Sequence, residues 1–124
     1  ADFISLHVAL TAETRGLIDA RALAAMKPGV VLVNTARGGV VDEPALVQAL
    51  ESGQLGAVGL DVFESEPLDD KHPLLGFPNA VLTPHIGSAS VETRVRMVDL
   101  AVANLLAGLR GEPLPACANP DVQR

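Results

Sequence analysis

The chain has 124 residues, a formal net charge of −6 and a hydrophobic fraction of 48%, with three Phe and neither Trp nor Tyr. Negative charge and few aromatic side chains argue against nucleic-acid binding, which uses clustered positive charge and stacking surfaces. The single cysteine, Cys117, excludes a disulfide framework and a Cys-rich metal site, and we expect no bound metal. A lone thiol fits a reducing cytosol, and no apolar run is long enough to span a bilayer, so we expect a cytoplasmic protein without a membrane partner.

The chain opens with a predicted strand at residues 2–8, which a turn at residues 11–16 follows. Asp19 can cap a short helix over residues 20–26. The β-branched run at residues 30–33 is typical of a buried strand in a parallel sheet. Because a domain seldom begins inside what resembles a central strand, we expect the sequence to be part of a longer protein.

A second helix is predicted over residues 43–52, with Asp42 as its cap, and a third strand over residues 57–62. An acidic loop with several prolines, residues 64–78, leads to the fourth strand, residues 80–83. Strands that alternate with helices through short connections predict a parallel sheet with right-handed crossovers. The expected fold class is therefore α/β, with half of a doubly wound parallel sheet.

The last predicted helix is long and ends near Leu109, and either Ser88 or Ser90 can cap its first turn. Its apolar positions recur every three or four residues, which is the pattern of a helix that packs one face on a core. These positions are Val91, Val95, Val98, Val102, Leu105, Leu106 and Leu109. We expect this helix to share one domain, residues 1–111, with the sheet, and residues 112–124 to form an irregular tail.

Chemically active side chains stand at the carboxyl ends of three predicted strands. Arg37 lies in a Gly-rich turn, Asp61 ends the third strand, Glu64 and Glu66 follow in the acidic loop, and His85 follows the fourth strand. Ligands of open α/β sheets bind at this edge. Each residue taken singly has an ordinary reading as a surface, capping or loop residue. Residue types alone do not decide which of the two glutamates meets His85.

Together, these groups suit the reduction of a keto acid. A guanidinium can hold a carboxylate by two parallel hydrogen bonds, and a histidine paired with a carboxylate tends to keep a proton that it can donate. A keto acid held in this way needs only a hydride, which proteins obtain from nicotinamide or flavin. Residue type alone gives His7 and His72 structural or surface roles.

The motifs around these residues resemble those of the D-isomer-specific 2-hydroxyacid dehydrogenases, and most of all the glyoxylate/hydroxypyruvate reductase branch. The similar motifs are at residues 1–8, 26–29, 34–42, 59–67, 83–88 and 104–113. The resemblance implies a Rossmann-like fold, of which this chain is the C-terminal half of the dinucleotide-binding domain with a long C-terminal helix. It also implies NAD or NADP as cofactor and the reduction of glyoxylate or hydroxypyruvate, which are small 2-keto acids, to glycolate or glycerate.

The resemblance further implies roles for single residues. Arg37 would bind the substrate carboxylate and keto oxygen, His85 would be the acid/base, and Glu66 would be its partner. The implied cofactor contacts are His7, Val8, Thr35, Ala36, Arg37, Asp61, His85, Gly87 and Ser88. Ala9 stands where the family commonly has Pro, which is a small departure beside the cofactor.

The family's other parts are not found in the sequence. There is no Gly-x-Gly-x-x-Gly to hold the pyrophosphate, and no charged residue after a following strand to separate NAD from NADP. We therefore expect an incomplete chain that is inactive alone and marginally stable or self-associating, whereas the intact protein would be a homodimer. The alternatives are a non-catalytic NAD(H)-binding interaction protein and an inactive fragment of the same fold.

Overall fold

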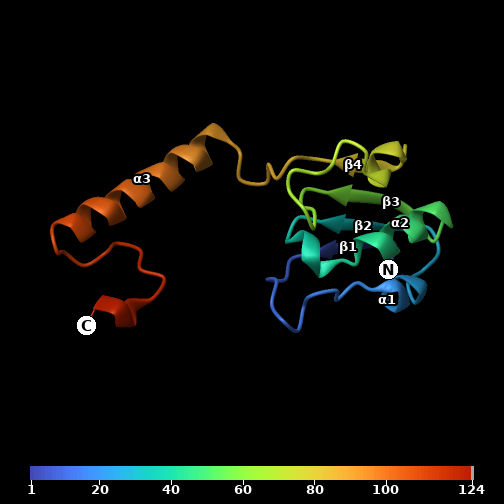
Figure 1. The fold of residues 1–124 in the computed structure, drawn as a ribbon, viewed down its shortest axis with the longest axis horizontal. Helices are drawn as coiled ribbons and strands as arrows, with labels where there is room; N and C mark the ends of the chain where they lie inside the picture. Colours follow the sequence, from blue (N-terminus) through green and yellow to red (C-terminus); the bar gives the residue numbers. More distant parts are fainter. Residues whose placement is uncertain (124) are drawn as a thin grey trace. The chain divides into compact units, whose positions relative to one another are not determined.

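The computed structural model describes residues 1–123 and divides into two compact units, Ala1–Gly87 and the residues from Ser88 onward (Figure 1). The first unit contains β1 (Phe3–Leu6), α1 (Ala20–Ala24), β2 (Val30–Asn34), α2 (Glu43–Glu51), β3 (Leu55–Leu60) and β4 (Ala80–Leu82), with short 3-10 helices η1 (Gly38–Val40) and η2 (Pro73–Gly76). The second unit contains α3 (Val91–Leu109) and the 3-10 helix η3 (Pro120–Gln123).

The strands of the first unit form one parallel sheet in the order β1-β2-β3-β4. The β1–β2 ladder pairs Phe3 with Val31 and continues to the end of both strands, so the carboxyl ends of the strands lie level. Successive right-handed crossovers in one direction place α1 and α2 on the same face of the sheet. The predicted parallel α/β fold is confirmed.

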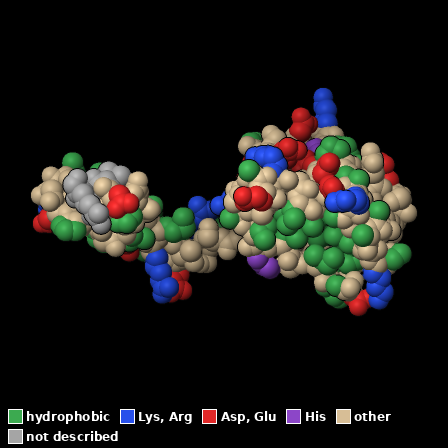
Figure 2. Space-filling view, turned by 90° about the horizontal axis from the view of Figure 1, so that it is seen from below, with side chains coloured by type: hydrophobic (Ala, Val, Ile, Leu, Met, Phe, Trp, Pro, Cys, Tyr) green, Lys and Arg blue, Asp and Glu red, His purple; other side chains and the backbone are tan. Residues whose placement is uncertain are grey.

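The core of this unit lies between the sheet and its two helices. Leu23 from α1, Leu46 from α2 and Leu32 from β2 are all at most 2% exposed. Val31 and Val33 alternate with the buried residues of β2 and remain half-exposed. Strand β2 is therefore buried on the face that the helices of this unit cover and partly exposed on the other. Figure 2 shows hydrophobic side chains that reach the surface of this unit.

Several predicted element boundaries differ from those in the structure. Strand β1 is shorter than the predicted 2–8, because only Phe3–Leu6 pairs with β2. Helix α1 ends at Ala24, where Gln54 Nε2 donates to the carbonyls of Leu23 and Met26, each at 3.0 Å. Strand β3 begins and ends two residues earlier than predicted, and the side chain of Asp61, the residue after the strand, binds the loop after β4.

In the second unit, Ser90 is the residue that caps α3, through a hydrogen bond from the Thr93 N–H to its Oγ at 3.2 Å. The seven predicted core positions of this helix are all exposed, from 43% at Leu106 to 83% at Val91. Within this unit Ala107 is the only residue of α3 that is buried, so the residues of this unit do not cover the apolar face of the helix. Beyond α3, the tail contains the short 3-10 helix η3.

No helix in the described part of the chain has the length and apolar character needed to cross a membrane.

Candidate active site

A buried asparagine fixes the turn that carries Arg37. Asn34 ends β2 and is 1% exposed. Its Oδ1 accepts a hydrogen bond from the Ala36 N–H at 3.0 Å, and its Nδ2 donates to the Arg37 carbonyl at 3.0 Å. The Arg37 side chain itself is exposed, and its Nη1 donates to the Ala36 carbonyl at 2.6 Å. This role of Asn34 was not predicted, although Asn at the end of a strand is a known signal for such a side-chain turn.

The next residue, Gly38, brings this turn against the loop after β3. A Cβ atom at Gly38 would lie 1.9 Å from the carbonyl carbon of Phe63 and 2.3 Å from the backbone nitrogen of Glu64. No side chain fits there, because backbone atoms cannot rotate away as a flexible side chain can. Glycine at this position therefore allows the Arg37 turn to pack directly on the start of the Glu66 loop.

Asp61, which is buried, organises the loop that carries His85. Its Oδ1 accepts hydrogen bonds from the Thr83 hydroxyl at 2.6 Å and the Ile86 N–H at 2.8 Å, and its Oδ2 accepts from the Gly87 N–H at 2.9 Å. The Thr83 hydroxyl, followed by the Ile86 amide, lowers the pKa of Asp61 below its ordinary value despite the opposing effect of burial. Both carboxylate oxygens are thus engaged within the protein.

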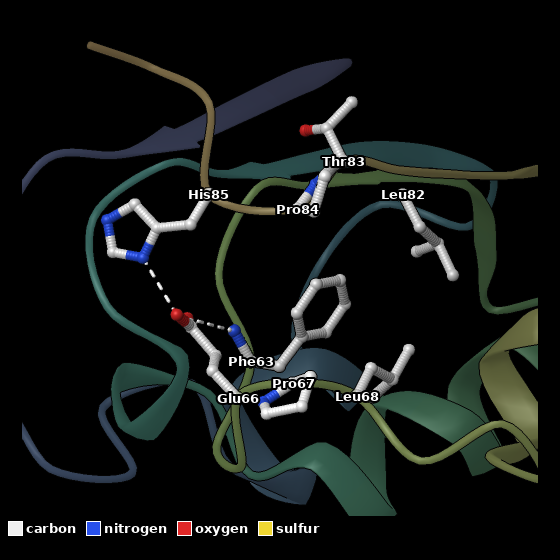
Figure 3. Close-up of a pocket in the computed structure, with 8 residues that line it drawn as sticks. All are labelled: Phe63, Glu66, Pro67, Leu68, Leu82, Thr83, Pro84 and His85. Atoms are coloured by element: carbon white, nitrogen blue, oxygen red, sulfur yellow. Dashed lines mark hydrogen bonds and ion pairs between the residues drawn. The ribbon is translucent and has the colours of Figure 1, made fainter. Parts of the chain in front are cut away.

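His85 and Glu66 form a pair at the carboxyl edge of the sheet (Figure 3). The ring Nδ1 lies 2.8 Å from Glu66 Oε2, and Glu66 Oε1 accepts a hydrogen bond from the Phe63 N–H at 3.0 Å. The hydrogen bond with His85 is the largest cause of a lowered pKa at Glu66; the Phe63 amide also lowers it, and the charge of Arg37 adds a smaller effect. Because Glu66 is an ionised acceptor, Nδ1 carries a proton and the ring presents Nε2 on its other side.

The backbone at His85 is left-handed, with φ of 54°. Residues with a Cβ atom are uncommon in this region, and His is among those that tolerate it best. The Asp61 contacts to the two following amides hold this conformation, which turns the ring toward Glu66 (Figure 3). Of the two candidate glutamates in the acidic loop, Glu66 is the one that the fold places against His85.

Most of the predicted site residues line two hollows in the first unit. An open groove of about 680 Å³ at the ends of β1 and β2 is lined by His7, Val8, Ala9, Leu10, Thr35, Ala36 and Arg37. A smaller pocket of about 370 Å³ is lined by Phe63, Glu66, Pro67, Leu68, Leu82, Thr83, Pro84 and His85 (Figure 3). Gly87 faces Asp61, and Ser88 is the first residue of the second unit.

The groove suits one part of a nicotinamide dinucleotide. It lies beyond the carboxyl ends of parallel strands, where doubly wound folds bind such cofactors, and its volume is in the range of small-molecule sites. Exposed His7 hydrogen-bonds Ser5 Oγ through Nε2 at 2.8 Å. The residues present fit the nicotinamide side of a cofactor, whereas the sequence has no Gly-rich turn for its pyrophosphate. Within residues 1–123, no cluster of three or more His, Cys, Asp and Glu side chains is placed to hold a metal ion.

Comparison with known proteins identifies the class to which this fold and site belong. Residues 1–87 match the family described as "D-isomer specific 2-hydroxyacid dehydrogenase, NAD binding domain". The chain therefore belongs to the D-isomer specific 2-hydroxyacid dehydrogenases, and the resemblance noted in the sequence is confirmed.

Two of the three similar proteins below are named as reductases of glyoxylate or hydroxypyruvate. The chain is 52% identical over 122 residues to the glyoxylate reductase of Thermofilum pendens, which covers 98% of this chain and 36% of the relative. The structure of the TT0316 protein from Thermus thermophilus superposes with a TM-score of 0.92 at 54% identity, covering 96% of this chain and 38% of that one. The NADPH-dependent glyoxylate/hydroxypyruvate reductase from Sinorhizobium meliloti, in complex with NADP and malonate, gives 0.85 at 47% identity, with 96% and 37% covered. The chain thus spans less than two-fifths of each of these proteins.

Proposed function

We propose that this chain supplies the acid/base half of the active site in an NAD(P)-dependent reductase of small 2-keto acids, such as glyoxylate or hydroxypyruvate. The observation that carries the proposal is the Glu66–His85 pair, held at 2.8 Å beside the Arg37 turn. The activities named for its relatives support this substrate class. Because those relatives are longer, the reaction belongs to a complete protein that contains these residues.

In the proposed reaction, each residue has a separate task. When bound, the nicotinamide cofactor supplies the hydride. Arg37 binds the carboxylate of the keto acid through its planar guanidinium and orients the keto carbon. His85 holds a proton at Nε2 and donates it to the keto oxygen as that oxygen becomes a hydroxyl group. Glu66 fixes the ring through Nδ1 and stabilises the imidazolium form from which the proton leaves.

The proposal includes the cofactor contacts and the setting of the protein. The contacts would come from His7, Val8, Thr35, Ala36, Arg37, Asp61, His85, Gly87 and Ser88. The groove at the ends of β1 and β2 supports the first five of these. We also propose that the complete protein is a cytoplasmic homodimer, which the free thiol of Cys117 and the exposed apolar side chains support.

The test is the replacement of His85 by Asn in the complete protein. We expect kcat on glyoxylate or hydroxypyruvate to fall by about 10²–10⁴-fold, which is the usual contribution of a general acid. The far-ultraviolet circular dichroism spectrum should match that of the parent and thereby show that the fold is intact. Turnover within about threefold of the parent would contradict the role of His85. Cofactor binding without turnover of any 2-keto acid by the parent would favour the non-catalytic alternative.

A further inference from the structure

One carboxylate holds both ends of the segment that carries Glu66. Glu43 is the first residue of α2, and its side chain is 15% exposed. Its Oε2 accepts a hydrogen bond from the backbone N–H of Glu64 at 3.1 Å, and its Oε1 lies 2.9 Å from Nε2 of His72. Glu66 lies on the chain between these two contacts, so Glu43 bridges the base of the loop.

The geometry of His72 shows that its ring proton faces Glu43. The Leu74 N–H donates to His72 Nδ1 at 3.3 Å, so Nδ1 carries no proton and the proton lies on Nε2. Leu74 is fully buried, and it anchors this end of the loop in the core. The His72 side chain is 21% exposed, so its contact with Glu43 is partly shielded from water.

Neighbouring amides connect this bridge to the proposed acid/base pair. The Glu64 N–H donates to Glu43, and the preceding amide, the Phe63 N–H, donates to Glu66 Oε1 at 3.0 Å. Phe63 and Glu64 are consecutive residues, and only the two dihedral angles of Phe63 separate their amide planes. We therefore expect a displacement of the Glu64 amide to move the Phe63 amide as well. Gly38 packs on the same two residues from the side of the Arg37 turn. The position of Glu66 therefore depends on contacts that converge on Phe63 and Glu64.

We propose that Glu43 and His72 are positioning residues that lock residues 64–72 and thereby hold Glu66 in place against His85. They touch neither the keto acid nor the cofactor in this scheme, and they act through the Phe63 amide and the Glu66 carboxylate. The effect on turnover rests on the proposed function, whereas the coupling between Glu43 and Glu66 is a property of the fold.

The test uses two variants and a matched control in the complete protein. Glu43→Gln has a single side-chain oxygen and cannot accept hydrogen bonds from both ends of the loop. His72→Asn keeps an acceptor for the Leu74 N–H but is too short to reach Glu43. Glu51→Gln makes the same charge change at the exposed last residue of α2 and serves as the control.

The primary measurement is the titration of the Glu66 side-chain carboxyl carbon by NMR in ¹³C-labelled protein, with Glu66→Gln used to assign the signal. We expect the pKa of Glu66 to rise toward its ordinary value in Glu43→Gln and His72→Asn, because its Phe63 and His85 partners move away. Exchange of the Phe63 amide with solvent should accelerate about tenfold or more in both variants. The Glu51→Gln control should match the parent in both measurements.

Kinetics then test the catalytic consequence. We expect kcat to fall about tenfold in both variants, since small displacements of catalytic groups cost up to about 10²-fold, while KM for the cofactor stays within about twofold. An unchanged Glu66 titration and an unchanged Phe63 amide in both variants, with only the Glu64 amide exchanging faster, would overturn the proposal. If the parent reduces no keto acid and the Glu66 titration still shifts in both variants, the positioning role is supported and the proposed function is refuted.

Discussion

At the scale of single residues, Asp61 makes the stability of the first unit depend on pH. Its carboxylate accepts three hydrogen bonds, and its pKa in the folded protein is lowered chiefly by the Thr83 hydroxyl. A lowered pKa in the folded state stabilises the fold at pH values above the unfolded pKa of about 3.9. This contribution is lost as the pH falls through the lower, folded pKa.

We therefore expect Asp61→Asn to destabilise the protein by about 1–3 kcal/mol at pH 7, because one carboxamide oxygen cannot satisfy the buried donors that faced a carboxylate. The difference in unfolding free energy between parent and variant should shrink below about pH 4, where Asp61 takes up a proton in the unfolded parent and, at lower pH, in the folded parent as well. Urea denaturation at pH 7 and at pH 3 measures both values. A difference that stays constant over this range would contradict the role of the ionised carboxylate.

Sequence reasoning at this scale succeeds where chemistry is concentrated in a motif. Arg37, Glu66 and His85 stand at strand ends, and the structure places Glu66 against His85 and the Arg37 turn against the loop that carries Glu66. Asn34 binds the turn that follows it in the chain, so its role could have been predicted from the local sequence. Glu43 differs, because it meets residues that the fold brings to it from 21 and more positions away. Nothing in the local sequence distinguishes the Glu43 contacts from those of an ordinary first-turn glutamate.

At the scale of elements, the first turn of α3 shows how precisely a helix-capping residue can be predicted from the sequence. The sequence left Ser88 and Ser90 as equal candidates, and in the structure the Ser90 oxygen accepts from the Thr93 N–H. Which serine caps the helix depends on where the backbone leaves the extended conformation, and a side-chain pattern locates that point only to within a few residues. The observed strand boundaries differ from the predicted ones for a related reason, because the pairing between neighbouring strands decides where each strand ends.

Replacing Ser90 with Ala should lower the stability of α3 by about 0.5–2 kcal/mol, because the Thr93 amide loses its partner. The same change at Ser88 should alter stability by less than about 0.5 kcal/mol, as for most exposed positions. Circular dichroism at 222 nm, followed through thermal unfolding, measures both effects. Equal losses in the two variants would mean that the cap is shared or misassigned.

At the scale of the whole molecule, large apolar side chains are exposed within each of the two units. Phe3 is 75% exposed on β1, which is an edge strand of the sheet, and the apolar side chains of α3 are exposed within the second unit. The periodicity of α3 correctly predicted an amphipathic helix, but a pattern of apolar residues does not say which surface covers it. An unpaired sheet edge also offers backbone groups to another chain.

We therefore expect the 124-residue chain to self-associate, so that its apparent mass in sedimentation equilibrium rises with concentration. Phe3→Lys should reduce this association, because a charged side chain on an edge strand disfavours pairing with a second edge. Leu75→Lys, which changes a side chain that is 55% exposed in η2, is the matched control and should have a smaller effect. A monomer at all concentrations that unfolds cooperatively above about 60 °C would contradict this expectation.

Because the backbone at His85 is left-handed, the residue that would be most stable at this position differs from the residue that the proposed reaction needs. A residue with a Cβ atom is disfavoured in this conformation by about 1–2 kcal/mol, whereas the partly exposed pair with Glu66 returns only about 0–1 kcal/mol. His85→Gly should therefore unfold at an equal or higher temperature than the parent while losing its turnover. A library screened for heat resistance alone would accumulate Gly or Asn at this position, and only a screen for activity would retain the histidine.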